Sequence, residues 1–154
     1  MRKTFWTLVI LFVFNFLCCK SPADPEIEKA LEELKEARIT ISISPNPLVV
    51  EPSLLYGAGA SLIPMTIRFT EHEGVSAQLY NFGYEVTIIG TNSTPSLIDF
   101  DDGKLDANGS LEFFEQIYIW ATQEPCEVEV WGQFTDENGH DIEAATYVRV
   151  EPYT

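Results

Sequence analysis

The sequence predicts an all-β domain, a two-sheet antiparallel β-sandwich of seven or eight strands that follows a short N-terminal helix. Two observations predict this class. From residue 39 onward, apolar residues recur at every second position, which is the period of a strand with one buried face. Clusters of Gly, Pro, Asn and Asp separate these runs, and no helical period returns after residue 38. Many short strands in one domain-sized segment favour a sandwich, with a closed barrel as the alternative.

The first element is an export signal at residues 1–18. Arg2 and Lys3 precede an apolar stretch at residues 5–17, which has the length of a signal peptide and is short for a bilayer span. The stretch ends in F-L-C-C at residues 16–19 rather than in a small-residue cleavage site of the A-x-A kind. This ending resembles a bacterial lipoprotein signal, in which the Cys after the cleavage point receives a diacylglyceryl thioether.

Cys19 fits that resemblance better than Cys18, because the residue before the modified Cys should be small and Leu17 is large. The resemblance implies lipid attachment at Cys19. In a Gram-negative bacterium, Lys20 would not signal retention in the inner membrane. Lipidation at Cys18 with a Cys19–Cys126 disulfide, ordinary cleavage and an uncleaved anchor remain open alternatives. Otherwise Cys126 is expected to be a small buried residue at the start of a strand.

The second element is a linker and helical spacer at residues 19–38. Residues 21–25 are turn-rich, and strong helix formers fill residues 26–38. Ile27, Leu31 and Leu34 form one narrow apolar stripe. A helix of this length is marginal alone in water. We therefore expect a spacer that holds the following domain off a membrane, with a partner-binding helix as the alternative.

The third element is the β domain at residues 39–154. Its expected strands lie around residues 39–44, 48–50, 63–70, 84–88, 111–119, 126–134 and 148–150, with a weaker one at 97–100.

Several of these segments resemble bacterial Ig-like domains. They are residues 39–50 (ITISISPNPLVV), 65–75, 108–110, 128–139 (VEVWGQFTDENG) and 147–150. The resemblance covers about residues 39–151 and implies an Ig-like sandwich with a binding or structural role. It transfers no functional residues, because such domains share no common site. The antibody pattern of paired cysteines around a buried Trp is absent from this sequence.

The charge of the chain restricts its partners. The whole chain carries a formal charge of −15, and residues 39–154 alone hold 18 acidic and 3 basic side chains. Such a surface disfavours nucleic acids and anionic lipid headgroups.

An acidic loop is a candidate calcium site, because carboxylate oxygens are ligands that Ca²⁺ prefers. Its candidate ligands are Asp99, Asp101, Asp102 and Asp106. No frame of this loop fits the EF-hand spacing, and Asp-Gly and Asn-Gly are also common turn formers.

No catalytic signature accompanies these features, and we expect neither an enzyme nor a cofactor. No Ser lies in a nucleophile-elbow context. His72 and His140 lack zinc-site spacing, and solvated turn histidines are the expectation.

A candidate contact patch comes from strand parity. If Val128 and Val130 face the core, Trp131 points outward, and Tyr147 and Arg149 share that face on the neighbouring last strand. Ile89 is a possible neighbour. Exposed aromatic residues beside Arg are common at contact surfaces. The alternative is that the spacer helix covers this face.

The sequence therefore predicts a non-enzymatic protein that is exported and anchored by an N-terminal lipid to the cell envelope, on the outer membrane if the cell is Gram-negative. Its Ig-like domain would face the periplasm or the cell surface and bind an envelope or extracellular protein or a glycan. The alternatives are an inhibitor of an exported protease that acts through loop residues 93–102, and a calcium-dependent adhesion module.

Overall fold

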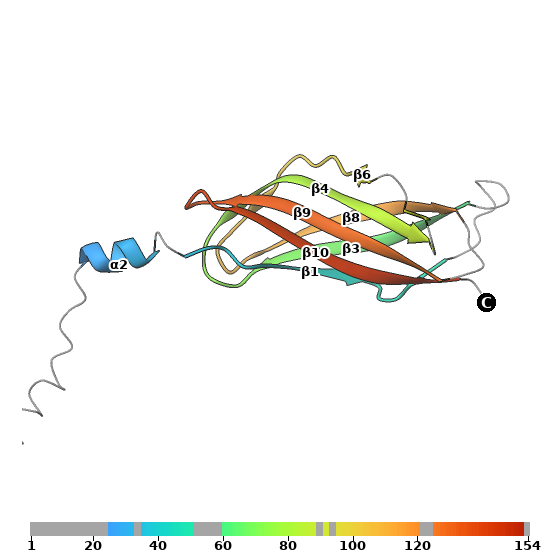
Figure 1. Cartoon of the computed structure of the whole chain (residues 1–154), viewed down its shortest axis with the longest axis horizontal. Helices are drawn as coiled ribbons and strands as arrows, with labels where there is room; N and C mark the ends of the chain where they lie inside the picture. Colours follow the sequence, from blue (N-terminus) through green and yellow to red (C-terminus); the bar gives the residue numbers. More distant parts are fainter. Residues whose placement is uncertain are drawn as a thin grey trace, which may run out of the picture. The chain divides into compact units, whose positions relative to one another are not determined.

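The computed structural model describes residues 25–32, 35–50, 60–88, 91–92, 95–120 and 125–152. The chain divides into two compact units, residues 1–34 and residues 35–154. The first unit contains helix α2 (Pro25–Glu32), and the second contains the described strands (Figure 1).

Helix α2 is shorter than the sequence predicts. It begins at Pro25, one residue before the expected helix formers, but it ends at Glu32, and residues 35–38 are not helical. The N–H groups of Ala37 and Arg38 donate instead to side chains of the β domain, Asp136 and Glu71. An N–H group used in this way is lost to the helical i to i−4 pattern. Ile27 and Leu31 lie on α2 as predicted, and Leu34 lies outside the described residues.

The second unit contains a three-stranded and a seven-stranded sheet. The first has the order β1 (Ile39–Ser44), β3 (Ala60–Glu71), β8 (Ser110–Trp120). The second has the order β2 (Leu48–Val49), β10 (Asp141–Glu151), β9 (Cys126–Asp136), β4 (Ala77–Ile88), β5 (Thr91–Asn92). Short strands β6 (Ser96–Leu97) and β7 (Lys104–Leu105) also pair with β4.

The all-β prediction is confirmed, with differences in detail. The pairing of β2 with β10 is parallel, whereas the others are antiparallel. Strand β4 begins at Ala77 and β10 at Asp141, both earlier than expected. Of the expected strand at 97–100, only Leu97 lies in a strand, the two-residue β6. The first half of β10 alternates less clearly in hydrophobicity, so the sequence does not mark it as a strand. It is a strand in the structure because it forms hydrogen bonds with β9.

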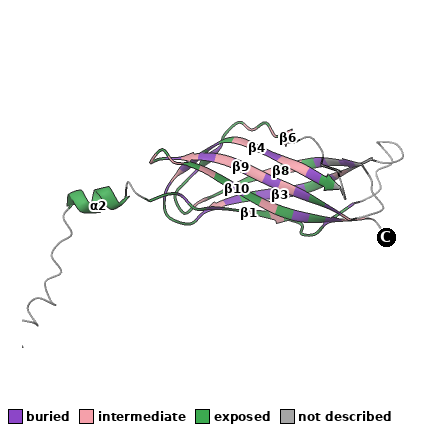
Figure 2. Ribbon diagram, in the orientation of Figure 1, coloured by how far each residue is buried: buried purple, intermediate pink, exposed green. Residues whose placement is uncertain are grey.

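The two sheets pack face to face around an aromatic core. Phe69 of β3 lies edge-on to Phe82 of β4 and Phe134 of β9, with ring centroids 5.3 and 5.2 Å apart, and also contacts Phe113 of β8. Buried and exposed residues alternate along the strands (Figure 2). The period-two pattern therefore reports burial between the sheets.

Candidate functional site

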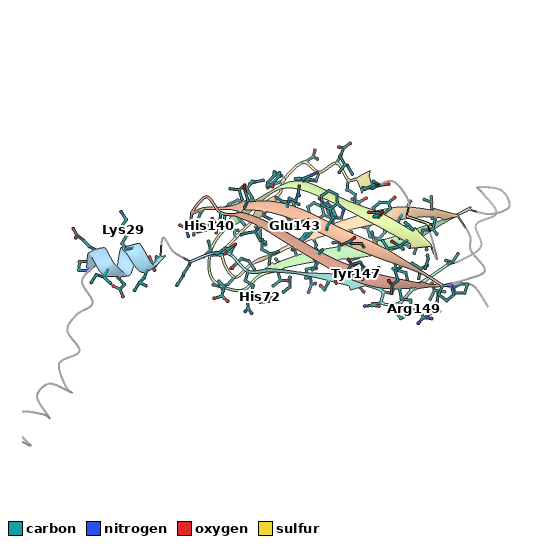
Figure 3. All side chains as sticks on the ribbon, in the orientation of Figure 1. Lys29, His72, His140, Glu143, Tyr147 and Arg149 are labelled. Atoms are coloured by element: carbon teal, nitrogen blue, oxygen red, sulfur yellow. The ribbon has the colours of Figure 1, made fainter. Side chains whose placement is uncertain are left out.

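The outer face of the seven-stranded sheet carries the predicted contact residues. The register places Trp131 between Gly83 and Ala145, and it places Tyr147 opposite Glu129 and Arg149 opposite Glu127. These pairs form neighbouring rows across β4, β9 and β10, and Figure 3 shows Tyr147 and Arg149 along β10. The structure therefore brings Trp131, Tyr147 and Arg149 to one face, which we call the Trp131 face. Ile89 lies outside the described residues.

Trp131 is less accessible than strand parity implies. A Cβ atom on Gly83 would lie 2.8 Å from Cζ2 of Trp131, so the indole covers the strand position where β4 has no side chain. The Trp131 residue is consequently half-buried, whereas Tyr147 is 63% exposed. The Trp131 indole therefore forms a flat, half-buried part of this face, and the accessible groups are those of Tyr147 and Arg149.

The Trp131 face is acidic. Tyr147 donates a hydrogen bond of 2.9 Å to Oε1 of Glu129, and Arg149 forms a 2.7 Å ion pair with Glu151. The bond to Glu129, together with the charges of Glu129, Glu127 and Glu85, raises the pKa of Tyr147 above its ordinary value of 10.0. Tyr147 therefore remains a neutral donor at physiological pH.

Two shallow depressions lie in the described surface. The first, of about 270 Å³, borders the Trp131 face and is lined by Thr87, Pro125, Cys126, Glu127 and Arg149. Cys126 is buried and free at the start of β9, as predicted, and burial raises the pKa of its thiol.

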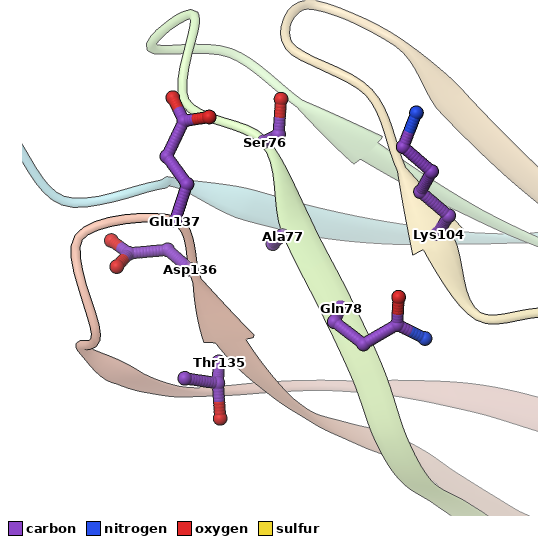
Figure 4. Close-up of a pocket in the computed structure, with 7 residues that line it drawn as sticks. All are labelled: Ser76, Ala77, Gln78, Lys104, Thr135, Asp136 and Glu137. Atoms are coloured by element: carbon purple, nitrogen blue, oxygen red, sulfur yellow. The ribbon is translucent and has the colours of Figure 1, made fainter.

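The second depression, of about 230 Å³, lies where β4, β7 and β9 meet (Figure 4). It is lined by Ser76, Ala77, Gln78, Lys104, Thr135, Asp136 and Glu137. The Lys104 ammonium pairs with Asp106 at 2.7 Å. The Asp136 carboxylate accepts hydrogen bonds from the N–H groups of Asn138 and His140, and it lies 2.9 Å from Nδ1 of His140.

The structure does not support the predicted calcium site. Among the described residues, no three His, Cys, Asp or Glu side chains are grouped so that they could hold a metal ion. The positive charge in this loop comes from Lys104. Its ammonium pairs with Asp106, and its backbone N–H donates to Asp102. Asp99 and Asp101 are exposed and join no such group.

The two histidines bind different partners. Nε2 of the exposed His72 lies 2.8 Å from Oγ1 of Thr40. Nδ1 of His140 lies 2.9 Å from Oδ2 of Asp136, whose side chain is fully buried. His140 follows a turn and its side chain is 39% exposed, in line with the expectation, but its ring also lies against a buried carboxylate, which the sequence did not indicate.

Two buried carboxylates at one end of the domain were not predicted as important residues. Glu71, which is 2% exposed, accepts hydrogen bonds from the N–H groups of five residues: Arg38, Glu73, Gly74, Val75 and Asn108. Asp136 accepts from the N–H groups of Ala37, Asn138 and His140. We call these two side chains the carboxylate pair.

The carboxylate pair fixes the linker to the domain. Besides the bonds to Ala37 and Arg38, the N–H of His72 donates to the Arg38 carbonyl and the side-chain amide of Asn138 donates to the Lys35 carbonyl. Residues 35–38 therefore bind at the end of the domain that holds His72 and His140, whereas Arg149 lies toward the other end (Figure 3).

A signal for the carboxylate pair exists in the sequence. Each acid is the last residue of an inward-facing row, after Phe69 in β3 and after Phe134 in β9. Each is followed three positions later by glycine, and Gly74 and Gly139 adopt φ values of +78° and +87° that turn the chain back over the carboxylate.

Burial by itself would raise the pKa of Glu71, but the N–H groups of Asn108, Glu73, Gly74 and Arg38 together outweigh burial and hold that pKa below its ordinary value of 4.5. Burial likewise acts to raise the pKa of Asp136. The N–H and imidazole of His140 and the N–H of Ala37 outweigh it and lower that pKa below 3.8. Both groups are therefore carboxylates in the native protein at neutral pH.

Other predicted features lie outside the described residues, namely the signal at residues 1–18 and Cys19. The described residues include no helix with the length and hydrophobicity needed to cross a bilayer.

No protein-family model and no curated protein matches the chain. Sixteen chains in solved structures are similar to it, among them the following two. The putative ApaA protein from Bordetella pertussis is 16% identical, with a TM-score of 0.59 over 78% of this chain and 98% of that chain. The structural genomics target SoR45 is 13% identical, with a TM-score of 0.58 over 75% of this chain and 86% of that chain. At such identities the likeness is one of fold and does not extend to function.

Proposed function

We propose that this chain is a non-enzymatic cell-envelope protein that a lipid on Cys19 holds to a membrane, and that its sandwich is Ig-like and binds a protein or glycan through the Trp131 face. The observation that carries the proposal is the attachment of residues 35–38 to one end of the domain through the carboxylate pair. A tether attached at that end leaves the accessible groups of Tyr147 and Arg149 free for a partner.

The lipid supplies the membrane attachment in this proposal. Each buried CH₂ group of an acyl chain contributes roughly 0.8 kcal/mol, so the several chains of a lipoprotein hold it stably without an inserted helix. The residues between Cys19 and residue 35 would act as the spacer that holds the domain off the bilayer.

The anchor is tested by substituting each of the two adjacent cysteines. We expect that a bacterial host grown with labelled palmitate labels the wild-type chain and the Cys18→Ser variant, and that Cys19→Ser abolishes the label and releases the chain from the membrane fraction. Cys18→Ser is a matched control, because serine keeps the residue before Cys19 small. Label that persists in Cys19→Ser but not in Cys18→Ser would assign the lipid to Cys18, and an unlabelled wild-type chain would contradict the anchor.

The contact face is tested by photo-crosslinking on intact cells. We expect a photoreactive residue at position 147 to yield a discrete adduct, and one at position 42 to yield none, because Ser42 is exposed on the other sheet. Trp131→Ala should lower the yield of the adduct from position 147, because it removes the indole from the same face. Adducts from position 101 alone would favour the protease-inhibitor alternative, since Asp101 lies in the loop that an inhibitor would use.

A further inference from the structure

The second surface with a binding geometry is the free edge of β8. Strand β8 is 11 residues long and terminates the three-stranded sheet, where it pairs with β3. In the part of the chain that the structure describes, no strand pairs with its other edge. The neighbouring segment uses its backbone hydrogen bonds elsewhere: the Ile98 N–H donates to Phe82 of β4, and the Gly103 carbonyl accepts from Leu79. An open strand edge is a template for a further strand.

The side chains of β8 do little to block such pairing. The strand contains no Pro and no Lys, the residues that commonly protect an edge. On its outer face Phe114 is 68% exposed, and the nearby Glu112 is neutralised by Arg68. An added strand would therefore meet an uncharged, partly apolar outer surface.

The inner row of β8 contains one charge. Leu111, Phe113, Glu115, Ile117 and Ile119 follow one another at every second position. Glu115 is half-buried opposite Met65, and its side chain forms no hydrogen bond or ion pair with the described part of the chain. Burial raises the pKa of Glu115, which indicates that its carboxylate lacks compensation.

The surroundings of this edge are acidic. The rings of Phe100 and Phe113 lie 5.9 Å apart, so the segment around Phe100 adjoins the inner row of β8. That segment carries the exposed side chains of Asp99, Asp101 and Asp102. Together with Glu115 they would repel a second copy of this acidic chain and attract a cationic one.

We propose that the free edge of β8 binds, by strand addition, an extended basic segment of a partner protein. The backbone of that segment would pair with β8. A Lys or Arg would lie opposite Glu115, and apolar side chains two positions on either side would lie opposite Phe113 and Ile117. This surface is separate from the Trp131 face and does not depend on the lipid anchor.

The test uses the full-length protein and three synthetic peptides. The first peptide, acetyl-KTVTKTVTK-amide, alternates so that its central Lys and both Val can face the inner row. The second has Glu in place of the central Lys. The third has Pro in place of both Val and of the two Thr beside the central Lys, which keeps the charge but removes backbone donors whichever way the peptide runs along β8. Affinity is measured by calorimetry, and the position of binding by amide hydrogen exchange.

We expect the first peptide to slow exchange within residues 110–120, the second to bind at least tenfold more weakly, and the third to give no protection. Glu115→Gln should remove most of the difference between the first two peptides. Glu143→Gln is the matched control, because it makes the same charge change on exposed Glu143 of β10 and should preserve that difference.

Three results would overturn the proposal. The first is equal affinity for the Lys and Glu peptides, which would show that the charge opposite Glu115 does not affect binding. The second is protection outside residues 110–120 or an equal effect of the two substitutions. The third is protection of β8 that rises with protein concentration without peptide, which would make a second copy the occupant. If circular dichroism shows that Glu115→Gln is unfolded, the affinities of the three peptides for the wild-type protein and the position of their protection still test the proposal.

Discussion

Replacing Glu71 with alanine is expected to lower the free energy of unfolding by about 3 kcal/mol or more, because five backbone N–H groups lose a charged acceptor. Hydrogen bonds to a charged group contribute roughly 1.5–3 kcal/mol each, and water can replace only some of them in a buried site. A domain of this size is stable by only about 5–15 kcal/mol. The variant should therefore lose a large share of its stability.

The loss should be structural as well as energetic, because Glu71 joins separate segments. Its donors lie in the linker at Arg38, in the turn after β3 and at Asn108 before β8. In Glu71→Ala these segments lose their common acceptor. We therefore expect faster amide exchange at residues 38, 73–75 and 108 than in the wild-type protein.

Urea unfolding followed by circular dichroism measures the stability change, and Glu73→Ala is the matched control. The exposed Glu73 side chain pairs with Arg38 at the surface, while its backbone N–H donates to Glu71 whatever its side chain. Surface ion pairs contribute about 0–1 kcal/mol, so this control should stay close to the wild-type protein. Similar losses in the two variants would contradict the role assigned to Glu71.

How much the sequence predicts depends on whether a feature belongs to one strand or to several. Alternation along β9 correctly places Trp131 on the outer face, because parity is a property of a single strand. It overestimates the exposure of Trp131, since the indole covers Gly83 on a strand that is remote in sequence. Register between strands decides such contacts, and the hydrophobic pattern alone does not specify it.

The acidic residues illustrate the same limit. Glu71, Glu115 and Asp136 each continue an inward-facing row, so alternation marks all three as unusual. The first and third end their strands and receive N–H groups from turns and from the linker, whereas Glu115 lies in the middle of a strand and receives none. Sequence position indicates this difference, but the donors from residues 37 and 38 become apparent only in the fold.

The stability of the protein is expected to fall as the pH drops below about 4.5, because both members of the carboxylate pair have lowered pKa values in the native state. In the unfolded chain Glu71 and Asp136 take up protons near their ordinary values of 4.5 and 3.8, while in the native protein they do so only at lower pH. Over that interval the unfolded state binds more protons, so acid favours unfolding. The stabilisation is complete above the ordinary values and is lost once the pH falls through the native ones.

The large negative charge of the chain acts in the opposite direction. Protonation of exposed carboxylates relieves repulsion within a chain of formal charge −15, which by itself would stabilise the folded state in acid. A decline in stability below pH 4.5 would thus identify groups that are bound as carboxylates in the native protein. Asp136 should account for part of it, because its side chain accepts from Ala37, Asn138 and His140.

Urea unfolding at several pH values between 7 and 3 measures this dependence in the wild-type protein and in Asp136→Asn. The variant should be less stable at pH 7 and should lose less stability on acidification, because position 136 no longer titrates. Asp141→Asn is the control, since exposed Asp141 on neighbouring β10 accepts only from the Thr135 hydroxyl among the bonds described. This control should show the same dependence of unfolding free energy on pH as the wild-type protein. If Asp136→Asn and Asp141→Asn flatten the pH dependence equally, general charge repulsion rather than the carboxylate pair controls acid stability.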